Sequence, residues 1–351
     1  MFAPLFGANI FIYMHVQRHT SLLPYNTFGI DVEADTLITV ESEQDLRQLI
    51  ADRSLQEGRY LVVGGGSNLV FTQPYRGTVV LMRNKGIRVQ SVDGDEVLVE
   101  AQAGEEWDAF VRHCVDHDLY GLENLVGIPG SVGAAPVQNV GAYGTEAGDA
   151  ISLVRAYDLR TGELKVLNQR QCRFGYRDSV FKHEQQGRLI VCSVIFRLSR
   201  QFVPNLSYRG LATAVNQRGL RFPTAQQIVD TVASLRSSKL PDPKEIGSAG
   251  SFFKNPIVSA EQLSRLRAQY PNIVSFAMEP DGYKLAAGWL IEQCGWKGRS
   301  LGNAGVYDKQ SLVLVNRGGC TGMEVQRLAK AISDDVEQRF GVRLEPEAIY
   351  V

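Results

Sequence analysis

The sequence predicts an α+β protein of two or three domains. Its 351 residues are enough for a large buried core, and its 44% hydrophobic and 21% charged residues are typical of a folded chain. Strand-like runs dominate residues 36–199, whereas helical patterns with one strand among them dominate from residue 223 onward. This order, without an internal repeat, indicates the α+β class.

The first region, from about Thr36 to Met82, alternates short strands with one helix. A capping box from Ser42 to Asp45 predicts that the helix begins there and runs to about Arg53. β-rich residues predict three strands, Leu37–Val40, Tyr60–Val63 and Thr78–Leu81. Together they predict a small α/β unit.

The second region, from about Ile87 to Ser199, is richer in strands. We expect hairpin turns at Asp93-Gly94 and Thr161-Gly162, a helix from Glu105 to His117 between them, and a closing strand from Leu189 to Leu198. From about Pro223 onward the pattern predicts four helices and one strand, namely Gln227–Ser237, Ala260–Tyr270, Leu285–Cys294, Met323–Phe340 and the strand Leu312–Val315.

The charge balance argues against a nucleic-acid-binding protein. Lys plus Arg total 37 and Asp plus Glu total 38, so no global field attracts a polyanion, and any anion must be bound by a local cluster. The five cysteines are an odd number without a CxxC pair, which predicts reduced thiols in a cytoplasmic protein. No two of the five histidines have a convincing ligand spacing, so we expect no metal site.

The first residues, Met1 to Val16, are largely apolar. They lack the basic start of a secretory signal and are shorter than the roughly 20 residues of a membrane span. Residues 1–19 are therefore expected to be a tail outside the fold. A start at Met14 is a second interpretation, and it is slightly favoured.

Two glycine-rich segments are candidate ligand loops. The first is Gly64-Gly65-Gly66-Ser67-Asn68, directly after a predicted strand, where glycines let backbone amides turn toward a phosphate. It lacks Rossmann spacing and a Walker lysine, and a tight turn explains it as well. The second runs from Gly121 to Gly144, and an extended ligand would offset the entropy lost on ordering it. A long surface loop is its alternative interpretation.

The run Gly250-Ser251-Phe252-Phe253-Lys254-Asn255-Pro256 is the third candidate. It places a hydroxyl, an ammonium and an amide among two aromatics, and its glycine and proline disfavour a helix. We expect a shaped loop or strand end. The alternative is a turn in which Ser251 and Asn255 bond their own backbone.

Seven motifs carry a resemblance to a known family. They are Asn26–Ile30, Gly64–Asn68, Ile128–Gly133, Gln138–Gly144, Arg173–Ser179, Lys239–Pro243 and Gly250–Pro256. Each motif is weak alone, but the seven in this order resemble the UDP-N-acetylenolpyruvoylglucosamine reductase family. The match runs from about Asn26 to Glu347, which is nearly the whole chain.

The resemblance implies a two-part FAD-binding domain of the vanillyl-oxidase type plus a C-terminal α+β substrate domain. Residues 20–86 and 87–200 would form the two FAD-binding parts, residues 201–340 the substrate domain, and residues 341–351 a C-terminal strand carrying Glu347. By the same resemblance, the residues that hold FAD are Gly64, Gly65, Gly66, Ser67, Asn68, Pro129, Gly130, Ser131, Gly133, Asn139, Gly141 and Ala142. Neither segment contains a histidine, which indicates noncovalent FAD.

The resemblance also implies the chemistry. NADPH gives a hydride to the flavin, and the enolpyruvyl ether of UDP-N-acetylglucosamine then receives hydride at C3 and a proton at C2. Ser251 matches the proton donor, and Arg177 and Glu347 match the residues that stabilise the developing negative charge. Glu347 must be protonated or share a proton to do this. Without the resemblance, an Arg177–Asp178 ion pair and a solvated Glu347 would be the simpler interpretations.

Seven further residues fall where the family binds the substrate or NADPH: Tyr143, Tyr208, Arg236, Lys239, Asn255, Lys284 and Gln310. Tyr208 lies in the polar run Leu206–Gly210, which resembles a substrate-covering loop but is also compatible with simple packing. The lysines are otherwise ordinary surface charges. The chain stops four residues after Glu347, so the final strand is expected to be less well anchored than in relatives that continue.

The resulting expectation is a monomeric cytoplasmic reductase without a membrane partner. One alternative is another FAD-dependent oxidoreductase of the same fold, such as an oxidase of small alcohols, which would not need diphosphate contacts from Arg236 and Lys239. A second is an inactive nucleotide-binding protein, which an intact set of Ser251, Arg177 and Glu347 argues against.

Overall fold

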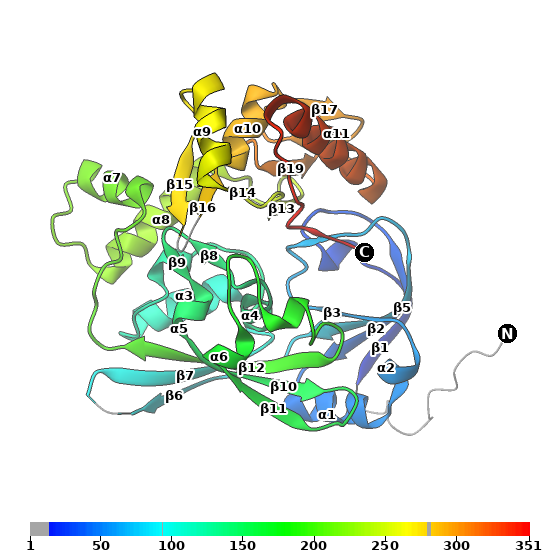
Figure 1. Ribbon diagram of the computed structural model, residues 1–351. Helices are drawn as coiled ribbons and strands as arrows, with labels where there is room; N and C mark the ends of the chain where they lie inside the picture. Colours follow the sequence, from blue (N-terminus) through cyan, green and yellow to red (C-terminus); the bar gives the residue numbers. More distant parts are fainter. Residues whose placement is uncertain (1–13, 93, 279–281) are drawn as a thin grey trace. The chain divides into compact units, whose positions relative to one another are not determined.

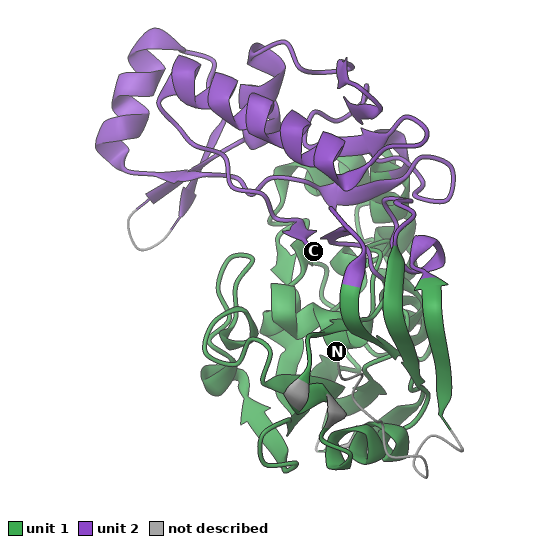
Figure 2. Cartoon of the chain, turned by 90° about the vertical axis from the view of Figure 1, so that its right-hand side faces the viewer, with its two compact units in different colours: residues 1–20, 33–65, 76–236 green, residues 21–32, 66–75, 237–351 purple. Residues whose placement is uncertain are grey.

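The structure is a computed structural model that describes residues 14–92, 94–278 and 282–351 (Figure 1). The chain forms two compact units, coloured separately in Figure 2. Unit 1 contains residues 1–20, 33–65 and 76–236, and unit 2 contains residues 21–32, 66–75 and 237–351. Both expected FAD-binding parts fall largely in unit 1, and their boundaries remain predictions. Residues 1–13 of the expected tail and Asp93 of the expected hairpin turn lie outside the described residues.

The first sheet of unit 1 has the order β1-β2-β5-β3. Its strands are β1 His15–Ser21, β2 Glu33–Val40, β5 Tyr75–Met82 and β3 Tyr60–Val63, with the helices α1 Glu43–Ala51 and α2 Ser54–Glu57 between β2 and β3. Helix α1 begins as predicted, because Ser42 Oγ accepts from Asp45 N and the Asp45 carboxylate accepts from Ser42 N. The expected tail is wrong for residues 15–19. They belong to a strand of this sheet, and the preceding Met14 is buried in the core.

The second sheet of unit 1 is antiparallel and has the order β11-β10-β12-β7-β6. Its strands are β6 Ile87–Ser91, β7 Glu96–Gln102, β10 Ile151–Asp158, β11 Leu164–Asn168 and β12 Leu189–Ser199. Helix α3, Trp107–Asp116, packs on it through aromatic contacts, with the Phe110 and Phe196 ring centroids 5.0 Å apart. The predicted hairpin at Thr161-Gly162 and the predicted closing strand are confirmed.

Short elements connect these sheets and complete unit 1. They are η2 Glu123–Leu125, η3 Val132–Ala134, α4 Ala135–Gln138, β8 Gly141–Ala142, β9 Thr145–Glu146, α5 Ala147–Ala150, α6 Gln169–Cys172, η4 Val180–Lys182, α7 Arg209–Gln217 and α8 Ala225–Lys239. Helix α7 was not predicted. It begins inside the run Leu206–Gly210 that we expected to be entirely a loop, with Tyr208 at its N-cap.

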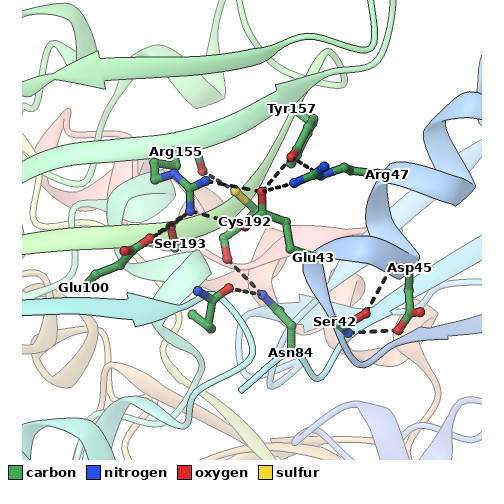
Figure 3. A network of polar contacts seen from close by, with 11 residues as sticks. Ser42, Glu43, Asp45, Arg47, Asn84, Glu100, Arg155, Tyr157, Cys192 and Ser193 are labelled. Atoms are coloured by element: carbon green, nitrogen blue, oxygen red, sulfur yellow. Dashed lines mark hydrogen bonds and ion pairs between the residues drawn. The ribbon is translucent and has the colours of Figure 1, made fainter. Parts of the chain in front are cut away.

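A polar network joins α1 to the second sheet (Figure 3). Arg155 of β10 contacts the Glu43 carboxylate at 3.2 Å and the Glu100 carboxylate at 2.8 Å. The Tyr157 hydroxyl donates to Glu43 at 2.6 Å, and the Arg47 guanidinium donates to Tyr157 at 2.8 Å. These bonds tie the small α/β part to the β-rich part within unit 1.

Unit 2 is built from small sheets and three helices. Its elements are η1 Leu23–Tyr25, β4 Leu69–Val70, β13 Ser248–Ser251, β14 Ile257–Val258, α9 Ala260–Gln269, β15 Ser275–Met278, β16 Gly282–Leu285, α10 Ala287–Gln293, β17 Ser300–Leu301, β18 Ala304–Val306, β19 Val313–Asn316, α11 Gly322–Phe340 and β20 Ile349–Tyr350. The sheet orders are β13-β19-β18-β17 and β14-β16-β15. The four helices predicted after residue 223, and the strand at 312–315, are present within two residues of their predicted ends.

The final strand, which we expected to be less well anchored than in relatives that continue, is paired within unit 2. Strand β20 pairs in parallel with β4, Ile349 against Leu69 and Tyr350 against Val70. The Thr72 amide and hydroxyl both donate to the Val351 carbonyl at 2.9 Å. The final strand is therefore held by a partner far away in the sequence.

All five cysteines are free thiols, and four of them are buried. Within the described ranges, no helix is both long enough and apolar enough to cross a membrane. The same part of the chain contains no cluster of three side chains suited to a metal ion.

Candidate active site

The two glycine-rich segments meet within unit 1. Gly64 and Gly65 follow β3 and lie against Gly130 and Ser131: a Cβ on Gly64 would be 2.0 Å from Ser131 Oγ, and one on Gly65 would be 2.8 Å from Gly130 Cα. Arg83 Nη1 donates to the Gly64 carbonyl at 2.9 Å and fixes the turn. Because side chains have no room here, backbone forms the surface, and this cradle fits a nucleotide phosphate.

The second half of the first loop belongs to unit 2. Gly66 has a φ of +62°, and a Cβ there would be 1.9 Å from the Tyr25 carbonyl oxygen. Half-buried Ser67 follows, and then Asn68, whose Nδ2 donates to the Glu347 carbonyl at 3.1 Å. The candidate cofactor loop is therefore bonded to the residue expected to stabilise charge.

The longer segment is held at the start of α3. Trp107 N donates to the Gly130 carbonyl at 3.1 Å, beside exposed Pro129. Gly133 N donates to the Ala103 carbonyl at 2.9 Å, and a Cβ on Gly133 would be 2.6 Å from Ala103 Cβ. Close backbone packing thus explains both glycines.

The buried side chain of Asn139 hydrogen-bonds to three neighbouring parts of this region. Its Nδ2 donates to Glu146 Oε2 at 2.7 Å and to the Gly175 carbonyl at 2.9 Å, and its Oδ1 accepts from Gly148 N at 2.8 Å. Its side chain is thus engaged with protein atoms, so it shapes the loop that leads into Gly141 and Ala142 of β8.

Tyr143 and Gly144 form the two-residue turn of the β8–β9 hairpin. Their φ values of +49° and +81° are those of a type I′ turn. The Tyr143 ring meets the Tyr208 ring edge-to-face, with centroids 5.3 Å apart. Burial raises the pKa of Tyr143, an effect that nearby Arg236 opposes.

Arg236 is held by its Nε, which donates to the Gly127 carbonyl at 3.0 Å. Unit 1 therefore gathers three candidate substrate-binding residues.

Arg177 is presented by a strained backbone. Its φ is +55°, its Nη2 donates to the Gly141 carbonyl at 2.6 Å, and its guanidinium lies 5.3 Å from the Tyr176 ring centroid. Asp178, the partner in the simpler interpretation, contacts His183 at 2.8 Å.

Left-handed backbone recurs among the candidates. Asn139, Tyr143 and Arg177 are three of the seven described non-glycine residues with positive φ. Such conformations cost about 1–3 kcal/mol each and concentrate at functional sites. This supports a functional role for the loops that carry them.

Unit 2 brings the backbones of Ser251 and Glu347 together. Ser251 ends β13 and is exposed, whereas Phe252 and Phe253 are buried. Phe252 N donates to the Leu312 carbonyl and Glu347 N donates to the Phe252 carbonyl, both at 2.7 Å. The run is the strand end that the sequence predicted. Arg177 belongs to unit 1.

Two amide side chains, those of Asn255 and Gln310, lie at the start of α10. Asn255 Oδ1 accepts from Ala287 N at 2.9 Å, and Gln310 Oε1 is 3.1 Å from the position of a Cβ on Gly288. Lys284 lies in β16, opposite Ile257, three residues before Ala287. Lys239 is exposed at the end of α8, three residues after Arg236.

Sequence reasoning missed two residues that hydrogen-bond to the backbone of these loops. Thr27 N donates to the Gly66 carbonyl at 3.2 Å, and its hydroxyl donates to the Ser248 carbonyl at 2.7 Å. Thr27 thus links the glycine loop to the strand that ends at Ser251. Buried Asn124 likewise links two segments, because its Nδ2 donates to the Tyr143 carbonyl and to the Asn205 carbonyl. Thr27 lies in the motif Asn26–Ile30 and Asn124 in the glycine-rich segment from Gly121 to Gly144, but neither residue was assigned a role of its own.

The fold and the glycine cradle define an FAD-binding oxidoreductase. Residues 34–168 match the family described as FAD binding domain, and residues 242–351 match UDP-N-acetylenolpyruvoylglucosamine reductase, C-terminal domain. A UDP-N-acetylenolpyruvoylglucosamine reductase of Pseudomonas putida is 48% identical over 94% of this chain and 97% of its own length. One of Paraburkholderia phymatum is 49% identical over 93% and 95%.

A solved structure agrees with these sequences. The UDP-N-acetylenolpyruvylglucosamine reductase of Thermus caldophilus superposes with a TM-score of 0.67 and 25% identity over 96% of this chain and 99% of its own. The chain belongs to the UDP-N-acetylenolpyruvoylglucosamine reductase family. The predicted fold class, an FAD-binding domain of the vanillyl-oxidase type plus a C-terminal α+β domain, is confirmed.

Proposed function

We propose that the protein reduces UDP-N-acetylglucosamine enolpyruvate to UDP-N-acetylmuramate with NADPH, a step of peptidoglycan precursor synthesis. The similarity to reductases over nearly the whole chain carries this proposal. When bound noncovalently in the glycine cradle, FAD would relay a hydride from NADPH to the enolpyruvyl double bond. Six of the twelve residues expected to hold FAD are glycines, and these would bind it through backbone atoms.

The reduction needs a proton as well as a hydride. Ser251 would donate its hydroxyl proton to C2 of the substrate while C3 receives the hydride. Its exposed place at the end of β13 supports this role, because the hydroxyl is accessible to a ligand. The buried Phe252 and Phe253 hold the backbone that aims it.

Two residues would stabilise the developing negative charge. Arg177 offers a fixed guanidinium, since its Nη2 is already bonded to the Gly141 carbonyl and the fork cannot swing freely. Glu347 would act as a protonated or proton-sharing carboxyl beside Ser251. Preorganised groups of this kind stabilise developing charge without reorganising.

The nucleotide and diphosphate would be bound by Tyr143, Tyr208, Arg236, Lys239, Asn255, Lys284 and Gln310. Arg236, Lys239 and Lys284 supply the positive charge, and the tyrosines and amides supply orientation. We further propose that the protein acts as a monomer in the cytoplasm, in keeping with its five free thiols.

The purified protein tests the proposal directly. It should be yellow and release FAD on acid precipitation. Under anaerobic conditions, NADPH alone should be oxidised only once per flavin, whereas continued NADPH oxidation should require the enolpyruvyl substrate and form a product two hydrogens heavier. A protein that takes up no FAD contradicts the proposal. A flavoprotein that ignores this substrate and consumes oxygen with small alcohols would be a different oxidoreductase.

A further inference from the structure

Asn124 joins two segments that are far apart in the sequence. It lies in η2, its residue is 3% exposed, and its Nδ2 donates to the Tyr143 carbonyl at 2.8 Å and to the Asn205 carbonyl at 2.9 Å. A buried amide that satisfies two carbonyl groups at once fixes the distance between them.

The side chain of Asn205 also hydrogen-bonds to the β8–β9 turn. Its Nδ2 donates to the Gly144 carbonyl and to Thr145 Oγ1, both at 3.1 Å, and its Oδ1 accepts from Ser207 N at 3.1 Å. A Cβ on Gly144 would be 2.3 Å from Ser207 Oγ, so the segment before Tyr208 lies directly on the β8–β9 turn. The side chains of Asn124 and Asn205 therefore both hydrogen-bond to the β8–β9 turn, and we call this pair of side chains the clasp.

The turn needs such support because its geometry is unusual for tyrosine. Asparagine and glycine are the residues that favour the first position of a type I′ turn, whereas Tyr143 has a φ of +49° there. The bond from Asn124 holds the carbonyl of Tyr143 itself. It thereby sets the direction from which the Tyr143 ring meets the Tyr208 ring.

We propose that Asn124 is a positioning residue that holds Tyr143 and Tyr208 in their arrangement for binding the nucleoside diphosphate part of the substrate. The inference rests on the proposed function of these tyrosines. Asn124 itself, nearly excluded from solvent, acts through them. Asn205 completes the clasp and is exposed, so replacing it should leave the core intact.

Steady-state kinetics test this with Asn124→Leu, Asn205→Ala and the control Asn216→Ala, an exposed asparagine of α7. Losing the clasp should raise the KM for the enolpyruvyl substrate by about tenfold or more while kcat and FAD content stay within about twofold. Asn216→Ala should behave as the unchanged protein. An unchanged KM in Asn205→Ala, or an equal fall in kcat and FAD content, overturns the proposal, even if Asn124→Leu does not fold.

Limited trypsin digestion gives a readout independent of activity. Arg209 follows Tyr208 directly, and Arg221 is an exposed arginine beyond α7. The clasp predicts that Asn205→Ala is cut several times faster at Arg209 but not at Arg221. Equal acceleration at both sites means general loosening and contradicts the clasp. If the unchanged protein lacks reductase activity, the proposed function fails, and the digestion still decides whether the clasp exists.

Discussion

The amide nitrogen of Glu347 donates a 2.7 Å hydrogen bond to the carbonyl oxygen of Phe252, the residue after Ser251. Lys254 N donates to the Glu345 carbonyl at 3.0 Å in the same antiparallel contact. Two backbone bonds and the buried Phe252 and Phe253 rings thus align a hydroxyl and a carboxyl from distant parts of the sequence. The alignment depends on backbone, so replacing either side chain should change chemistry more than folding.

Replacing Lys239 should change only substrate binding, whereas replacing Arg236 should change both substrate binding and stability. Lys239→Ala should raise the substrate KM by roughly 10- to 100-fold with normal FAD content, because a charge-assisted bond to phosphate contributes about 1.5–3 kcal/mol. Arg236→Ala should also lower the unfolding free energy by about 1 kcal/mol, because the Gly127 carbonyl loses its donor. Kinetics and denaturant unfolding measure both effects.

Lys330→Ala, in an exposed pair with Asp334, is the matched control and should change neither quantity. If Lys239→Ala matches the control in KM, Lys239 is a solvated surface charge and does not bind the diphosphate.

The Figure 3 network should make stability depend on pH. Burial alone would raise the pKa of Glu43, but the Tyr157 hydroxyl and the Arg155 guanidinium outweigh it and lower the pKa below the usual 4.5. Ionised Glu43 therefore contributes stability that is fully present above about pH 4.5 and is lost as pH falls through the lowered value. Glu43→Gln should be about 1–3 kcal/mol less stable at pH 7.

Urea unfolding of Glu43→Gln and the unchanged protein at pH 7 and at pH 3 checks this sign. The difference between the two stabilities should be smaller at pH 3 than at pH 7. A difference that is constant between the two pH values would mean that the network does not depend on the charge of Glu43.

Gly66→Ala should be far more damaging than Gly219→Ala. Both glycines have positive φ, +62° and +70°, which costs an alanine about 1–2 kcal/mol in either case. At Gly66 the new Cβ also meets the Tyr25 carbonyl, whereas nothing lies within 4 Å at Gly219. The unfolding temperature should fall further for Gly66→Ala than for Gly219→Ala, and the ratio of flavin to protein absorbance should fall only for Gly66→Ala; equal effects would mean that only backbone strain matters.

Local signals in the sequence predicted local structure well. The capping box at Ser42 placed the start of α1, and the helical pattern of Met323–Phe340 placed α11, because both depend on neighbours within a few residues. The glycine runs at Gly64 and Gly130 indicated a cradle, since only glycine permits such close backbone approach.

Long-range bonds could not be predicted in the same way. The pairing of β20 with β4, the placing of residues 21–32 and 66–75 in unit 2, and the bonds of Asn124 all join positions that no local pattern relates. The roles of Ser251, Arg177 and Glu347 came from resemblance, because an exposed serine or a half-buried glutamate has no chemical signature of its own.

The separated half-reactions of Ser251→Ala test the central claim most directly. Flavin reduction by NADPH needs only hydride transfer, whereas reduction of the enolpyruvyl substrate also needs the proton that Ser251 is proposed to donate. In anaerobic stopped-flow absorbance, Ser251→Ala should bleach with NADPH at nearly the normal rate and then reoxidise with the substrate about 10² times more slowly or worse. Equal slowing of both half-reactions, or normal reoxidation, would contradict the assignment of Ser251 as the proton donor.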